Sequence, residues 1–137
     1  MMIEKVLMKT KKADLTFFES GKINITSHVS RTLDLHAGDA INIARVEKGW
    51  TEYYLYVERR AGEMLGHHEG VCAVTHGHGR NLRVFNCRLS RYILGLCHTE
   101  GPLGLSIGTP EQVEGLGLAV PIILRPITTH PQNPERP

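Results

Sequence analysis

The sequence predicts a mostly β protein with a few short helices, folded as a small barrel from two tandem βαβ-type half-repeats. The main observation is a segment that occurs twice, once from Gly21 and again from Gly79. Each copy runs from a glycine and a basic residue, through alternating apolar positions, to a short helical pattern. A second observation is that several other short runs also alternate apolar and polar residues, as half-buried strands do.

The two copies correspond residue by residue once a single insertion is allowed. They match in their strand positions and in a Ser-Arg pair within the helical pattern. The aligned residues are Ile23 with Leu82, Ile25 with Val84, and Ser30-Arg31 with Ser90-Arg91. A repeat of this kind predicts two similar units that bury their apolar faces against each other.

The chain has 137 residues, of which 41% are hydrophobic, which is enough for one ordinary core. We expect a single domain in which both halves share that core. Its parts are a first half-repeat at residues 1–58, a Gly/His-rich connector at 59–78, a second half-repeat at 79–127 and a disordered tail at 128–137. Prolines and a scarcity of apolar residues predict the disorder of the tail.

Charge and cysteine content narrow the class of protein. The formal net charge is +2, so an anionic partner must be recognised by local clusters of charge rather than by the overall field. The three cysteines are widely spaced, which favours reduced thiols and a cytoplasmic location. No apolar run is long enough to span a membrane, and the first residues do not resemble a signal peptide.

In the first half, the expected elements follow from alternation, capping residues and turn residues. Residues 22–26 alternate polar and apolar side chains, and Ser27 can cap a short helix. Gly38-Asp39 suits a turn with positive φ and an Asx-type hydrogen bond. The full order is an edge strand or arm at 1–14, an apolar run at 15–18, a turn at 19–21, a strand at 22–26, the helix, a turn and strand at 35–43, a hairpin connection at 47–49 and a strand at 50–57.

In the second half, Asn86 is a good N-cap for a helix, and Gly95 is placed to end it. Thr109-Pro110-Glu111-Gln112 combines a cap, a first-turn proline and an early acid, which predicts another short helix. Pro121 indicates that the apolar strand at 118–124 is an edge strand or contains a bulge. The remaining expected elements are a short strand at 73–75, a loop at 77–79, and strands at 81–85 and 103–107.

The stretch Leu35-x-x-Gly38-Asp39-x-Ile41-x-Ile43, after the capped helix, resembles the GD box of cradle-loop barrels. The wider segment 21–43 is similar to one half of the AbrB/SpoVT-like proteins, and two tandem halves resemble the MraZ arrangement. The resemblance implies a barrel of swapped-hairpin or double-psi type. This chain departs from the family pattern at Thr26, at Ser30 and in the second copy, where Glu100-Gly101-Pro102 replaces the box.

The same resemblance implies a non-enzymatic, cofactor-free transcriptional regulator that binds double-stranded DNA as a homo-oligomer. Arg31 lies at a position where the family contacts DNA. Four arginines between positions 80 and 91 add local positive charge, which favours an anion-binding face. The expected nucleic-acid-binding residues are Lys22, Arg31, Arg80, Arg83, Arg88 and Arg91.

Two other interpretations stay open. The modest net charge and the altered second box fit a non-catalytic interaction or structural module, of mobile-element or phage type, that binds no DNA. The connector also contains competent metal ligands, but their spacing matches no standard signature, so we expect no metal cofactor. These weak candidates are His67, His68, Cys72, His76 and His78.

One stretch matches a catalytic pattern. Gly104-Leu105-Ser106-Ile107-Gly108 fits Gly-x-Ser-x-Gly, the nucleophile elbow, which needs a strand, a sharp turn at the serine and a following helix. Ser106 lies within an apolar alternation, so we interpret it as an outward-facing polar residue of a strand. The sequence therefore predicts no catalytic residue.

Overall fold

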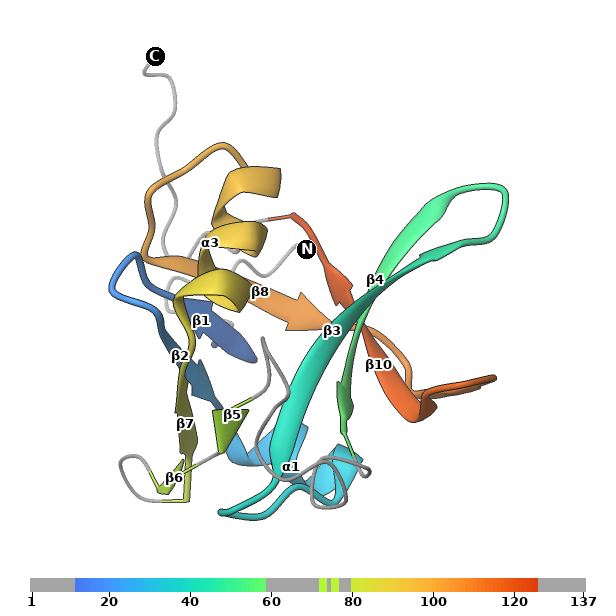
Figure 1. Ribbon diagram of the computed structural model, residues 1–137, viewed down its shortest axis with the longest axis horizontal. Helices are drawn as coiled ribbons and strands as arrows, with labels where there is room; N and C mark the ends of the chain where they lie inside the picture. The colour runs from blue at the N-terminus through green and yellow to red at the C-terminus, as the bar shows by residue number, and fades with distance from the viewer. Residues whose placement is uncertain (1–11, 59–71, 74, 77–79, 126–137) are drawn as a thin grey trace, which may run out of the picture.

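The computed structural model describes residues 12–58, 72–73, 75–76 and 80–125 (Figure 1). Within these ranges the protein is mostly β, with a ten-stranded sheet and two helices. The elements of the first half are β1 (Leu15–Phe17), β2 (Lys22–Ile25), α1 (Ser27–Leu33), β3 (Ala40–Glu47) and β4 (Thr51–Val57). The connector contains β5 (Cys72–Ala73) and β6 (Thr75–His76). The elements of the second half are β7 (Leu82–Phe85), α3 (Cys87–Leu96), β8 (Leu103–Ile107), β9 (Glu111–Val113) and β10 (Gly117–Ile123).

The sheet curls into an open, barrel-like shape. Its strand order is β5-β3-β4-β10-β8-β1-β2-β7-β6, and β9 pairs with β10. The two end strands, β5 and β6, are separated in the chain by one residue, so the curl brings the two ends of the sheet close together. The hairpin of β3 and β4 extends away from the body of the molecule, as Figure 1 shows.

The strands that begin the two repeated segments lie side by side. β2 and β7 pair antiparallel, with Ile23 opposite Val84 and Ile25 opposite Leu82. These four side chains are buried, so the remaining positions of both strands lie on the other face of this ladder. The β2–β7 ladder therefore has one face in the core and one facing away from it.

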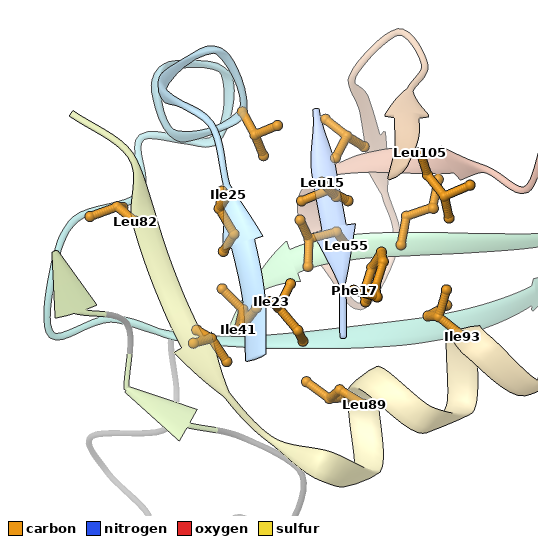
Figure 2. Close-up of a cluster of buried hydrophobic side chains, with 14 of the residues drawn as sticks. Leu15, Phe17, Ile23, Ile25, Ile41, Leu55, Leu82, Leu89, Ile93 and Leu105 are labelled. Atoms are coloured by element: carbon orange, nitrogen blue, oxygen red, sulfur yellow. The ribbon is translucent and has the colours of Figure 1, made fainter. Parts of the chain in front are cut away.

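The main hydrophobic core is built from both halves. Figure 2 shows side chains of β1, β2, β3, β4, β7 and β8 meeting those of α3, with Phe17, Ile23 and Ile93 among the most buried. α1 adds Val29 and Leu33, as its spacing predicts. Because each half contributes buried side chains to one cluster, neither half has a separate core.

A second, smaller cluster explains the uninterrupted aromatic run of β4. Leu55 and Val57 enter the main core, whereas Tyr54 and Tyr56 point the other way and pack with Ala119 of β10. Both faces of β4 are therefore covered, so its sequence shows little polar alternation.

The glycine-aspartate turn forms as expected. Gly38 has a φ of +96°, in the region that favours glycine. The Asp39 carboxylate accepts a hydrogen bond of 2.9 Å from the backbone N–H of His36, and the Asp39 N–H donates to the His36 carbonyl at 3.0 Å. This turn leads the chain from α1 into β3.

The helix boundaries differ in part from those expected. α1 begins at Ser27, but its N-cap is Thr26, whose hydroxyl donates to the Asp14 carbonyl and makes no capping bond. α3 passes through Gly95 and ends at Leu96, with Cys97 as its C-cap, so the prediction that Gly95 terminates the helix was wrong. The residue after the cap, His98, takes the left-handed conformation instead, with a φ of 55°.

The predictions for residues 109–112 and for the strand at 118–124 also need correction. The short helix expected at 109–112 is wrong, because Glu111–Val113 forms β9, a hairpin partner of β10. Positive φ values at Gly115 and Gly117 close this hairpin. β10 is not an edge strand, since it pairs with β4 and with β8. Pro121 is tolerated because β10 exchanges its β9 neighbour for β8 around this point, where its missing N–H costs no ladder bond.

The other expected elements are found, with small shifts. The apolar run at 15–18 contains β1, and the strands expected at 81–85 and 103–107 are β7 and β8. The strand expected at 73–75 is instead two short strands, β5 and β6, on either side of residue 74. The connector from 59 to 71, most of the N-terminal arm and the tail lie outside the described residues.

Asn86 caps α3 as predicted, because its side-chain oxygen accepts a hydrogen bond of 3.0 Å from the Leu89 N–H. We expect Asn86→Ala to lower the free energy of unfolding by about 1 kcal/mol, since the N–H loses its acceptor. Urea denaturation measures this change. Asn86→Ser, which keeps an oxygen at this position, is the control, and an equal loss in both variants would contradict a capping role.

Candidate nucleic-acid interface

A pocket beside α1 brings together arginines from the two repeated segments. Arg31 comes from α1 in the first half, and Arg80 comes from the residues just before β7 in the second half. The cavity has a volume of about 360 Å³. Its lining residues are Ser27, Ser30, Arg31, Asp34, Leu35, His36 and Arg80.

The local backbone around α1 positions these side chains. Arg31 Nη1 donates a hydrogen bond of 3.3 Å to the hydroxyl of Ser27, one helical turn earlier. Asp34 ends the helix in the left-handed conformation, with a φ of 55°. The turn that follows presents His36, whose Nε2 lies 3.6 Å from Asp34 Oδ1 at an exposed edge of the pocket. The pocket thus offers two guanidinium groups, hydroxyls and an imidazole, with one carboxylate at its edge.

Three of the other predicted basic residues lie at the opposite end of the β2–β7 ladder. Lys22 faces Phe85 across the ladder, and its Nζ lies 4.3 Å from the centre of the Phe18 ring. Arg88 and Arg91 are exposed on α3, which begins directly after β7. The ladder contains four residue pairs, so three steps of roughly 3.3 Å place its two ends about 10 Å apart.

α3 is held firmly at this end by polar contacts with the β1–β2 turn. The buried hydroxyl of Ser90 donates to the Phe18 carbonyl at 2.6 Å, and Arg91 Nε donates to the Glu19 carbonyl at 3.3 Å. Gly21 contacts the start of the helix closely, and its carbonyl accepts from the Asn86 N–H at 2.9 Å. The positions of the α3 arginines relative to β2 are therefore fixed by the fold.

Arg83 lies between the two basic groups. It is opposite Asn24 on the ladder face that points away from the core, and its guanidinium carbon lies 5.9 Å from the centre of the Phe85 ring. The Phe85 side chain is 58% exposed on this face. Sequence reasoning missed Phe85, although the alternation of β7 places it on the outer face.

A second polar cluster lies beside the turn of the β3–β4 hairpin and was not predicted. The Tyr54 ring is fully buried, and its hydroxyl lies 2.6 Å from Lys48 Nζ, 2.7 Å from Glu52 Oε1 and 3.1 Å from Glu111 Oε1. Burial, together with the carboxylate of Glu52, raises the pKa of Tyr54, while the hydrogen bond from Tyr54 lowers the pKa of Glu52. The cluster ties the hairpin to β9.

We expect the Tyr54→Phe variant to show a weaker pH dependence of stability. The raised pKa of Tyr54 stabilises the fold below its ordinary value of 10.0, and this stabilisation is lost as the pH rises through the folded-state pKa. The lowered pKa of Glu52 stabilises the fold above its ordinary value of 4.5, and this is lost as the pH falls. The melting temperature of the variant, measured across pH, should therefore fall less at both pH extremes than that of the unaltered protein. If the melting temperatures of the two proteins changed in parallel with pH, Tyr54 and Glu52 would not contribute to the pH dependence of stability.

The structure does not place Ser106 or Cys97 in a geometry that suits a catalytic nucleophile. Ser106 lies within β8 and is 7% exposed, so the prediction that it faces outward was wrong. The chain continues into β9 rather than into the helix that a nucleophile elbow requires. Burial raises the pKa of the Cys97 thiol, which disfavours the nucleophilic thiolate.

The histidines and the cysteine named as weak metal ligands belong to the connector. His67, His68 and His78 lie outside the described residues, and Cys72 and His76 belong to the short strands β5 and β6. Among the residues that the structure describes, no group of three or more His, Cys, Asp or Glu side chains is placed to hold a metal ion.

Over the described part of the chain, no helix combines the length and apolar character needed to cross a bilayer. Comparison with protein-family models, with curated proteins and with solved structures finds no match to this chain.

Proposed function

We propose that the chain is a non-catalytic, AbrB/MraZ-like DNA-binding protein that anchors phosphates with basic residues from both halves, as a transcriptional regulator does. The observation that carries this proposal is the pocket in which Arg31 of the first half meets Arg80 of the second. Guanidinium groups bind phosphate oxygens through paired, charge-assisted hydrogen bonds, so two of them around one concavity fit a phosphodiester group well.

The register of the β2–β7 ladder supports a two-fold relation between the halves. In the sequence alignment Ile23 corresponds to Leu82 and Ile25 to Val84, whereas across the ladder Ile23 faces Val84 and Ile25 faces Leu82. A two-fold axis through an antiparallel ladder exchanges equivalent positions in this crossed way. Under that relation Arg31 corresponds to Arg91, and Arg80 corresponds to Gly21, the residue before Lys22 at the other end.

Two related basic groups give a simple mechanism. Each group neutralises phosphates on one side of a groove, and counterion release supplies most of the affinity. Because these contacts reach phosphates rather than base edges, selectivity depends on the width and deformability of the duplex.

Fluorescence anisotropy with a labelled random-sequence duplex tests the proposal. We expect micromolar binding at low salt that weakens steeply as salt is added, because each phosphate contact contributes about −0.9 to the slope of log K against log salt. Absence of binding at low salt, or binding that is insensitive to salt, would overturn the proposal.

One observation favours the alternative of an interaction module. Trp50, at the end of the β3–β4 hairpin, is 61% exposed, and exposed tryptophan is common at protein contacts. If the chain bound no DNA and Trp50→Ala abolished the capture of a defined protein partner, this second function would replace the first.

A further inference from the structure

We infer that the outer face of the β2–β7 ladder binds single-stranded DNA by stacking an unpaired base on Phe85. This inference rests on the proposed function, since it assigns a second DNA form to the same basic surface. The aromatic ring is 58% exposed at the end of β7, where the strand passes into α3.

The surroundings of Phe85 distinguish it from an isolated exposed apolar residue. Arg83 lies on the same face with its guanidinium carbon 5.9 Å from the ring centre, and Lys22 is the cross-strand partner of Phe85. Lys22 also lies over the Phe18 ring at 4.3 Å, so each of these two cations accompanies an aromatic ring. Proteins that bind single-stranded nucleic acids often place aromatic rings between cationic side chains. The bases stack on the rings, and the cations neutralise the phosphates.

Charge complementarity favours a nucleic acid over an apolar partner on this face. Lys22, Arg83, Arg88 and Arg91 lie along it or at its end, and Glu19 is the acidic residue of the adjoining turn. A purely apolar protein partner would have to desolvate several of these cations. A strand of phosphates with an unpaired base satisfies both the ring and the charges.

Substitution of Phe85 tests the inference directly. We expect Phe85→Ala and Phe85→Leu to bind a labelled oligo-dT about tenfold more weakly than the unaltered protein, because a stacked base is worth roughly that much. Phe85→Tyr keeps a ring and should bind as before. Trp50→Ala removes an exposed aromatic side chain elsewhere and should also leave the affinity unchanged.

A fluorescent reporter locates the base. The chain has one tryptophan, so the double variant Trp50→Phe/Phe85→Trp carries a single indole at the ladder. Oligo-dT should quench its emission strongly, whereas an intact duplex, whose bases are already stacked, should quench it little.

The two hypotheses fail in different ways. If the protein binds a duplex with steep salt dependence but the Phe85 variants bind oligo-dT normally and no quenching occurs, the stacking inference is wrong and the duplex proposal stands. If neither DNA form binds at low salt, both are wrong. Because Phe85 is exposed, its variants should keep the wild-type melting temperature, which separates loss of stacking from unfolding.

Discussion

The double variant Arg31→Ala/Arg80→Ala should bind a random-sequence duplex about 100-fold more weakly than the unaltered protein at low salt. Both side chains line the same pocket, and each charge-assisted contact contributes on the order of tenfold to affinity. The slope of log K against log salt should fall in magnitude by about 1.8 if each guanidinium contacts one phosphate. Anisotropy titrations at three salt concentrations measure both quantities.

A matched double variant separates the effect of the pocket on DNA affinity from the effect of the net charge. Arg45→Ala/Arg125→Ala removes the same charge from exposed arginines that do not line the pocket. This control should lose only a small part of the affinity. Equal losses in the two double variants would mean that DNA binding depends on net charge and not on the pocket.

Gly21→Ala should destabilise the fold by about 3 kcal/mol, which lowers the melting temperature by roughly 10 °C for a chain of this size. Gly21 has a φ of +101°, where an L side chain is strained. A Cβ there would also lie 2.8 Å from Cys87 Sγ and 3.1 Å from the Cys87 backbone nitrogen. The backbone contact cannot relax without moving the start of α3.

Gly38→Ala is the control for this prediction. Gly38 also has a positive φ, of +96°, but a Cβ at this position meets no atom within 4 Å. The variant therefore carries the backbone strain alone, and its free energy of unfolding should be lower by about 1 kcal/mol. Calorimetric melts compare the two, and a Gly38→Ala loss as large as that of Gly21→Ala would show that packing against α3 is unimportant.

The strands were largely predictable because they depend on local alternation. β2 and β7 bury every second side chain, which the sequence displays directly, and β8 departs from this pattern only at the buried Ser106. The Gly38-Asp39 turn and the Asn86 cap were also predictable, since both are satisfied by bonds to residues within three positions.

The errors arose where distant residues decide the local structure. Residues 109–112 carry good helix-start signals, but Glu111 accepts hydrogen bonds from Lys48 Nζ and from the Tyr54 hydroxyl, on the far side of β10. Pairing with β10 then outweighs local propensity. Gly95 likewise stays helical because the turn that ends α3 is made three residues later by His98.

The candidate interface was predictable as a set of residues but not as a surface. A resemblance over about 25 positions singled out Arg31, yet its neighbourhood with Arg80 depends on how β2 and β7 pair. The separation of Lys22, Arg88 and Arg91 at the other end of the ladder follows from the same pairing. Phe85 was not predicted because alternation places its side chain on the outer face of β7 but does not show that the ring stays 58% exposed there.

Chemical-shift mapping on the isotope-labelled protein, titrated with a short duplex at low salt, tests the central claim most directly. The account predicts that the amide signals that move are those of α1, of the turn through His36 and of Arg80, together with those of Lys22 and the first turn of α3. Shifts confined to the tip of the β3–β4 hairpin around Trp50, or no shifts at all, would contradict it.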